Sequence, residues 1–380
     1  MQCPSRTLTA SADYSIMRVR NIFVIPRRQA ARNNGHEYIL FKPADPLFRK
    51  ERIIMGKKVD VLCIGTVVVD IMAKPIGQKQ VWKEKQRISQ IQILAGGDGA
   101  NQSLYLTDSG LKTAFVGCVG DDQNGQVIKQ LLHKRGVLTD FMQTRREYPT
   151  GTAIVLVDEK GERHTFSVYG AHSTISGSDC PITLPEGCKA VTLGSLFAMP
   201  ELEKYGKLEE LLQIYHAQGA LTFADLAPDK EKAGLAGIER FLPHLDYFIP
   251  SAYDALEMTG VRSVEEAAAL YRSKGAKNVI IKCGEKGCFY DTGDCSGWIP
   301  AIQVRTVDTT GAGDCMVALF VSRILSGDDV ETACRYACAG ASYSTLFPGA
   351  SAEQVTPERI KGWLRLQPGG KALEALSKRI

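Results

Sequence analysis

From Val59 onwards, short apolar runs alternate with segments whose apolar residues recur at helical spacing. The first run, VDVLCIGTVVVDI at 59–71, is rich in β-branched residues, which is typical of a central strand covered on both faces. Further strands are expected at 113–120, 189–194, 220–225, 245–250 and 278–284, and helices at 99–109, 125–136, 202–218, 231–242, 252–259 and 264–274. This alternation predicts βαβ units, and therefore an α/β fold with a mostly parallel central sheet flanked by helices.

Two stretches depart from this rhythm and alternate polar with apolar residues. They are 81–94, which contains KEKQRISQIQIL, and 151–170, which is predicted to form a hairpin that turns near Glu159–Gly161. A period of two is typical of half-exposed strands, so we expect a small sheet with strands at about 72–95 and 150–170. In α/β enzymes such an excursion often covers the ligand crevice, and we call this expected sheet the lid.

The first 54 residues show neither pattern and hold the whole basic excess. They carry a net charge of +6 while the full chain carries +4, so the rest of the chain carries −2. A nucleic-acid-binding body would need a basic face, and the charge distribution excludes one. The leader resembles a transit peptide, but an upstream start site is the simpler explanation because Met55 directly precedes the first strand. We expect a folded domain at 55–367, with residues 1–54 disordered or wrongly included and 368–380 forming a tail.

The cysteines and the apolar runs indicate the cellular compartment of the protein. Eleven cysteines occur without a CxxC pair or a zinc-ligand spacing, which favours reduced, buried thiols in a cytoplasmic protein. No stretch of about eighteen apolar residues occurs, so no transmembrane helix is expected.

Two common nucleotide-binding motifs are missing from the sequence. The Gly-Lys pairs at positions 56, 206 and 370 are not followed by Ser or Thr, so there is no P-loop. A dinucleotide fingerprint that begins at Gly97 would need glycine at position 102, where Gln102 stands. These observations exclude P-loop NTPases and Rossmann oxidoreductases.

The segment DTTGAGD at 308–314 is a candidate phosphoryl-transfer motif. Gly311, Ala312 and Gly313 precede an apolar helix, and their N–H groups can converge on an anion at the helix N-terminus. Asp314 follows directly, where it can take a proton from a hydroxyl while these N–H groups stabilise the phosphoryl group. A lone Asp in such a place usually only caps the helix. The three small residues before it favour a catalytic base.

The segment AGGDGANQS at 95–103 is a candidate hydroxyl-binding motif. Its adjacent glycines allow close approach of a ligand, and Asp98, Asn101 and Gln102 offer acceptors and donors for a polyol. A glycine turn before a helix is by itself usually only a turn. Together with Asp70 at the end of the first strand, it predicts a pocket for hydroxyl groups.

The two motifs together resemble those of the ribokinase-like (PfkB) family of carbohydrate kinases. The glycine motif is matched from Gly96 to Gly120 and the carboxy-terminal motif from Asp308 to Asp314, in the family's order. The resemblance covers about residues 59–350. It implies a ribokinase-like fold with a β-sheet lid, and ATP-dependent phosphorylation of a hydroxymethyl group on a sugar or sugar-like alcohol.

The resemblance also implies roles for individual residues. Asp314 would be the catalytic base, with an anion hole formed by Gly311, Ala312 and Gly313. The substrate would contact Asp70, Gly97, Asp98, Asn101 and, in the lid, Glu162. ATP would be flanked by Asp225, Lys282, Gly284 and Gly287. Asp254 would act on Mg²⁺ through water, and Asp308 would place a monovalent cation, as in relatives that use K⁺.

Some positions depart from the family pattern and leave alternatives open. Ser251 and Asp254 replace the Asn and Glu of an Asn-x-x-Glu motif, and Asp98 stands where ribokinases carry Lys, which argues against ribose. A nucleoside kinase of the same family and a catalytically silent sugar-binding regulator remain as alternatives, although the retained Asp314 argues against the second. The expected partner is a small molecule, without nucleic acid or membrane, and an exposed lid edge favours a homodimer through the lid.

Overall fold

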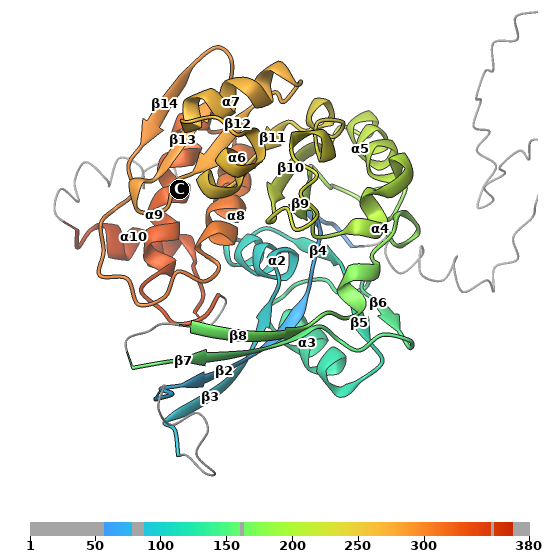
Figure 1. Ribbon diagram of the computed structural model, residues 1–380, viewed down its shortest axis with the longest axis vertical. Coiled ribbons are helices and arrows are strands. Elements are labelled where there is room, and N and C mark those ends of the chain that lie inside the picture. The colour runs from blue at the N-terminus through green and yellow to red at the C-terminus, as the bar shows by residue number, and fades with distance from the viewer. Residues whose placement is uncertain (1–56, 78–86, 160–162, 351–352, 368–380) are drawn as a thin grey trace, which may run out of the picture. The chain divides into compact units, whose positions relative to one another are not determined.

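A large sheet forms the centre of the computed structural model, which describes residues 57–77, 87–159, 163–350 and 353–367 (Figure 1). Its strand order is β14-β13-β12-β11-β10-β9-β1-β4, and the strands from β12 to β4 are all parallel, whereas β13 and β14 are antiparallel additions. The strands are β1 Val61–Ile64, β4 Thr113–Val116, β9 Ala190–Leu196, β10 Leu221–Leu226, β11 Tyr247–Phe248, β12 Val279–Lys282, β13 Cys288–Asp291 and β14 Ser296–Ile299. The predicted mostly parallel sheet is confirmed.

Helices cover both faces of this sheet. On one face, Phe320 packs edge-on against Phe223 and Tyr247, and on the other Tyr271 packs edge-on against Phe248. Neighbouring strand residues point to opposite faces, which is why Tyr247 and Phe248 contact different helices. The first face carries α2 Asp98–Asp108, α8 Ala312–Leu325, α9 Val330–Ser344 and α10 Pro357–Leu364. The other helices are α3 Gln123–Lys134, α4 Pro200–Glu203, α5 Lys207–Ala217, α6 Ala252–Thr259 and α7 Val264–Ser273.

The lid is present as a separate four-stranded sheet in the order β3-β2-β7-β8, and it projects below α2 in Figure 1. Its strands are β2 Val68–Lys74, β3 Gln90–Gly96, β7 Thr152–Val157 and β8 Arg163–Val168. The β7–β8 pair is the predicted antiparallel hairpin, although part of its turn lies outside the described residues. A third, two-stranded sheet pairs β5 Cys118–Gly120 with β6 Gln143–Arg145.

The expectation of one central strand over 59–71 is wrong. The run is divided between two sheets, because β1 ends at Ile64 in the main sheet and β2 begins at Val68 in the lid. Gly65 lies at the division, where a Cβ atom would be 2.7 Å from the Cα of Gly99 and 3.1 Å from that of Gly194. Three glycines therefore let β1, β9 and the start of α2 approach closely, and the chain leaves the main sheet at that point.

Other sequence-based boundaries change at glycines as well. The run at 113–120 is divided at Gly117 into β4 and β5, and the helix at 202–218 is interrupted at Gly206, where φ is +72°. The helix expected at 231–242 is wrong, since only 3₁₀ turns occur at 235–237 and 242–244. Gly234, with φ of +62°, begins the first of these turns and Pro243 lies in the second, so neither continues as an α-helix.

The described part of the chain is consistent with the expected cysteine chemistry. Its ten cysteines are all free, and seven of them are buried. Within the described ranges, no helix is long and apolar enough to cross a membrane. The leader 1–54 and the tail 368–380 lie outside the described residues.

Candidate active site

The two sequence motifs, far apart in the chain, meet beside the carboxyl ends of the parallel strands. Asn101 of α2 donates a hydrogen bond from Nδ2 to Oδ2 of Asp314 in α8 at 2.9 Å, across 213 residues. The other amide atom of Asn101, Oδ1, is buried without a hydrogen-bond partner among the described residues. A buried acceptor without a partner is costly, so this oxygen is suited to receive a ligand hydroxyl.

The N-terminus of α8 has the features of an anion hole. Gly311 precedes the helix with φ of +72°, and no side chain caps the first turn. A Cβ atom at Gly311 would lie 2.6 Å from Cβ of Ala350, so glycine is required both by the backbone and by the space. The Ala312 N–H donates a hydrogen bond to the Thr309 carbonyl at 3.2 Å. The next N–H groups of the first turn, those of Gly313 and Asp314, have no acceptor within the helix, so they can bind a phosphoryl oxygen.

Asp314 lies in this first turn and is buried, with 8% of its surface exposed. Burial raises the pKa of its carboxyl well above the usual value, and the carboxylates of Asp98 and Asp225 raise the pKa further, while Asn101 and Lys282 oppose the shift. A carboxylate with a raised pKa is a stronger base when it is ionised. The position and the environment of Asp314 therefore suit proton abstraction from an alcohol.

Two further carboxylates flank Asp314, and each has a side-chain partner. Asp98, the first residue of α2, accepts a hydrogen bond from the hydroxyl of Ser195 at the end of β9. Asp225 of β10 forms an ion pair with Lys282 of β12. Burial raises the pKa of Asp225 to about 6, although the charge of Lys282 opposes this shift. The contribution of Ser195 was not predicted, because nothing near it in sequence points to Asp98.

Asp70 projects from β2 of the lid against the glycine motif. A Cβ atom at Gly96 would lie 2.2 Å from Oδ2 of Asp70, so glycine makes room for this carboxylate. Gly97 is the residue that leads the chain into α2. It has φ of +92°, and its backbone lies close to the carbonyl of Thr66. Burial raises the pKa of Asp70 to about 6, although the charge of Arg163 opposes this shift. Asp70 thus lies where the sequence predicts it, although the predicted lid residue Glu162 is outside the described residues.

A cavity of about 580 Å³ lies beside the anion hole. Its lining includes the predicted residues Lys282, Gly284, Gly287, Ala312 and Gly313. Apolar side chains form another part of the wall, among them Ile302, Val304, Met316 and Ala341. This combination suits a nucleotide, whose base can pack its flat face on the apolar wall while its anionic phosphates lie beside Lys282 and the start of α8. Asp225 does not line this cavity, but its partner Lys282 does.

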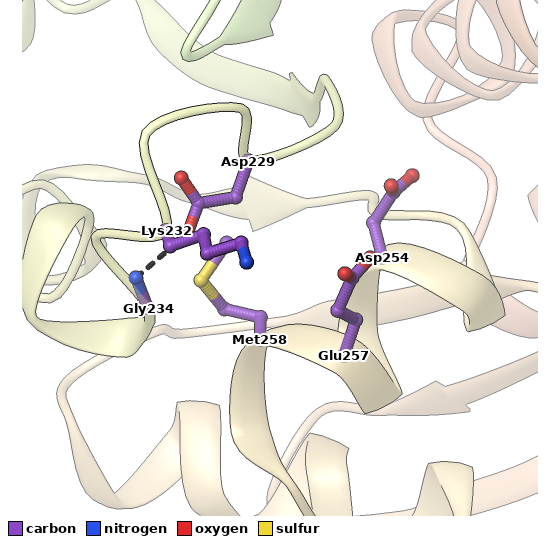
Figure 2. A pocket seen from close by; sticks show the side chains of 6 residues that line it. All are labelled: Asp229, Lys232, Gly234, Asp254, Glu257 and Met258. Atoms are coloured by element: carbon purple, nitrogen blue, oxygen red, sulfur yellow. Dashed lines mark hydrogen bonds between the residues drawn. The ribbon is translucent and has the colours of Figure 1, made fainter.

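A smaller cavity of about 240 Å³ contains Asp254, and Figure 2 shows Asp254 and Glu257 on the same side of α6 with Lys232 facing them. Asp254 Oδ2 accepts a hydrogen bond from the Ser251 hydroxyl at 2.5 Å, and Oδ1 is buried without a partner among the described residues. Burial raises the pKa of Asp254. No group of three or more potential metal ligands occurs in the described ranges. Mg²⁺ usually keeps several waters and phosphate ligands, so one free carboxylate oxygen fits contact through water.

Asp308 lies three residues before Gly311 in the loop that leads into the anion hole, and it contacts the lid. Its Oδ1 lies 2.7 Å from Nη2 of Arg163, the first residue of β8. Arg163 was not among the residues predicted from the sequence. Its position directly after the predicted lid residue Glu162 was the one local signal that pointed to it.

Comparisons with known proteins agree with this geometry. A model of the family described as pfkB family carbohydrate kinase matches residues 58–357. The ribokinase of Bacillus subtilis is 29% identical over 270 residues, which cover 71% of this chain and 87% of that protein. The deoxyribokinase of Salmonella typhi is 26% identical over 322 residues, covering 81% of this chain and 99% of that protein. An Escherichia coli structure described as a ribokinase II with ATP and Mg²⁺ has a TM-score of 0.72 and 23% identity, covering 81% of this chain and 100% of that chain.

The family match spans both motifs and the strands and helices that bring them together. It confirms the predicted ribokinase-like fold and the predicted enzyme class, a kinase that acts on a sugar-like alcohol. The chain belongs to the pfkB family of carbohydrate kinases.

Proposed function

We propose that this protein transfers the γ-phosphoryl group of ATP to a hydroxymethyl group on an uncharged sugar or sugar-like alcohol. The hydrogen bond between Asn101 and Asp314 is the observation that carries this proposal, because it joins the hydroxyl-binding motif to the anion hole in one site. The binding of hydroxyls and the activation of one of them then occur within the reach of neighbouring side chains.

Each part of the reaction has a candidate group in this site. Asp70 and Asn101 Oδ1 accept hydrogen bonds from substrate hydroxyls, and Asp314 takes the proton of the attacking hydroxyl. The N–H groups of the α8 N-terminus stabilise the charge on the transferred group. The phosphates of ATP lie between this helix and Lys282, with the base in the cavity of about 580 Å³. Mg²⁺, when bound, neutralises phosphate charge, and Asp254 would hold one of its waters.

The charge of the site favours an uncharged substrate. Four carboxyl groups surround the substrate region (Asp70, Asp98, Asp225 and Asp314). The neighbouring cations Lys282 and Arg163 already form ion pairs with Asp225 and Asp308. Because these two cations are already paired, an anionic substrate would meet an excess of negative charge from the described residues of the site, at a cost that rises with burial.

A screen of ATP consumption with Mg²⁺ tests the proposal over pentoses, hexoses, keto-deoxy acids and nucleosides. We expect the highest kcat/KM for a neutral sugar, with phosphate on its hydroxymethyl group identified by nuclear magnetic resonance. A higher kcat/KM for a nucleoside would instead select the nucleoside kinase alternative. Preferred turnover of a keto-deoxy acid would contradict the electrostatic argument. Binding of a sugar without turnover would favour the silent regulator.

Asp254→Asn is expected to raise the Mg²⁺ concentration needed for half-maximal rate about tenfold or more, with the sugar KM changed little. The reason is that Asp254 Oδ1 is free for a metal-bound water, whereas an amide is a weaker acceptor. Rates measured against Mg²⁺ at saturating ATP and sugar provide the test.

Glu257→Gln is the matched control, because Glu257 lines the same small cavity on the same face of α6. The substitution removes one negative charge, as Asp254→Asn does. It should leave the Mg²⁺ requirement nearly unchanged. An equal response in both variants, or none in Asp254→Asn, would leave Asp254 as an ordinary acid at the start of α6.

We also propose a homodimer through the outer face of the lid. One apolar residue from each strand lies in register across the whole sheet, namely Ile93, Ile71, Ile154 and Phe166. Ile93, Ile154 and Phe166 are 50%, 45% and 62% exposed. An apolar row that crosses four strands is suited to packing against the same row of a second copy.

Ile154→Lys is expected to convert the dimer to a monomer in sedimentation analysis, because it places a charge in the centre of this row. Tyr205→Lys is the control, since Tyr205 is 90% exposed and lies outside the lid. A monomeric wild-type protein would contradict the proposal directly.

A further inference from the structure

The carboxylate of Asp308 is almost fully engaged by neighbouring protein groups. Its Oδ1 accepts hydrogen bonds from the N–H of Thr310 at 2.8 Å and from the Thr310 hydroxyl at 2.7 Å, and Arg163 Nη2 lies 2.7 Å away. Its Oδ2 accepts a hydrogen bond from the N–H of Gly349 at 2.8 Å. The Asp308 side chain is only 8% exposed, so these contacts largely define its surroundings.

This carboxylate joins the two segments that form the wall of the anion hole. Thr310 directly precedes Gly311, and Gly349 directly precedes Ala350, which lies against Gly311. The position of Asp308 therefore sets the position of the first N–H groups of α8. Although burial acts in the opposite direction, the hydrogen bonds and the charge of Arg163 lower the pKa of Asp308.

Arg163 reaches this carboxylate from the lid. The strand register places Arg163 on the same face of the lid as Asp70, because Asp70 pairs with Ala153, and Ala153 pairs with Ser167 on β8. One guanidinium thus acts on Asp308 at the anion hole and, by its charge, on Asp70 in the substrate site.

A monovalent cation at Asp308 does not fit this arrangement. Oδ1 already has three donors, and a guanidinium carries a full positive charge on the same oxygen. A second cation bound to that carboxylate would be repelled at short range in a buried site. The expectation that Asp308 places K⁺ therefore conflicts with the contacts that Asp308 makes here.

We propose that Arg163 is a positioning residue that orders the loop before the anion hole, so that the kinase works without a monovalent cation. The proposal rests on the proposed function and adds a contribution of the lid to phosphoryl transfer. Because Arg163 belongs to β8, the ion pair forms only when the lid lies against the loop. Substrate enclosure and assembly of the anion hole are then linked through one side chain.

The kinetic test compares wild type with Arg163→Ala and Arg163→Lys, with KCl varied against choline chloride at constant ionic strength. We expect less than about a twofold effect of KCl on the wild-type rate, and a fall of about tenfold or more in kcat for Arg163→Ala. Guanidinium chloride should restore part of that rate, and Arg163→Lys should be intermediate because it keeps the charge and loses the planar fork. Arg146→Gln is the control, since Arg146 has 87% of its side chain exposed.

Two kinetic outcomes would overturn the proposal. One is a wild-type rate that rises severalfold with KCl, and the other is wild-type kcat in Arg163→Ala. Melting temperatures of both Arg163 variants show whether a loss of rate reflects a loss of folding, and rescue by guanidinium would not occur in an unfolded protein.

Hydrogen exchange without substrate separates this proposal from the proposed function. Amides at 308–313 and 345–350 should exchange faster in Arg163→Ala than in wild type, while those of β9 and β10 stay unchanged. Equal exchange at 308–313 in both proteins would overturn the positioning role even if the enzyme has the expected activity. Faster exchange in a protein that phosphorylates no substrate would contradict the proposed function alone.

Discussion

Asp314→Asn is expected to lower kcat by at least about two orders of magnitude, because a positioned base typically contributes ~10²–10⁴-fold. An alcohol is a poor nucleophile at neutral pH, and Asp314 is the buried carboxyl that lies at the start of α8 beside the anion hole. Asparagine has nearly the same shape, and its amide oxygen can still accept the hydrogen bond from Asn101. ATP affinity and thermal stability should therefore change little.

Turnover and melting temperature of this variant, on the best substrate of the screen, distinguish a base from a helix cap. Asp329→Asn is the matched control, because Asp329 caps α9 by accepting a hydrogen bond from the Thr332 N–H at 2.8 Å. It should keep full turnover and lose at most about 1 kcal/mol of stability. If Asp314→Asn behaves in the same way, with turnover within about fivefold of wild type, the catalytic assignment is wrong.

Asp70→Asn is expected to lower kcat/KM for the sugar about 10–100-fold, mostly through KM, with the KM for ATP unchanged. A hydrogen bond to a charged acceptor contributes about 1.5–3 kcal/mol, and the variant weakens such bonds to substrate hydroxyls. Asp70 is far along the chain from the ATP-cavity residues and does not line that cavity. An increase in the KM for ATP as large as that for the sugar would contradict this assignment.

The same residue predicts the acid limb of the pH profile. Burial raises the pKa of Asp70 to about 6, so the carboxyl becomes protonated as the pH falls through that value and is then a weaker acceptor for substrate hydroxyls. In wild type, kcat/KM for the sugar should fall about tenfold per pH unit below pH ~6. Asp70→Asn should lack this limb. If the limb persists, it belongs to another group, either the base Asp314, whose pKa burial raises well above the usual value, or Asp225, whose pKa burial raises to about 6.

Several features of the fold follow from local signals that the sequence displays directly. The helix predicted at 252–259 occurs with those bounds because Ser251 caps its first turn and Gly260, in the left-handed conformation, ends it. The lid hairpin follows from alternation alone. The anion-hole helix follows from the small residues before Asp314. Such signals depend on neighbours within a few residues, so no knowledge of distant segments is needed.

Other features depend on which distant segments approach one another. The run at 59–71 has uniform composition, and only the contact of Gly65 with Gly99 and Gly194 divides it between two sheets. Likewise, the partners that complete the site, Ser195 for Asp98 and Arg163 for Asp308, come from segments far away in the chain.

The sequence by itself determined the layered α/β architecture, the lid and the two motifs of the site, because periodicity and glycine spacing are properties of short segments. The tertiary structure alone decided which carboxylate has which partner, and therefore which of them are free to act on a substrate. Hydrogen bonds and ion pairs require specific atoms within about 3 Å, and that proximity arises only when strands far apart in the chain are packed into one sheet.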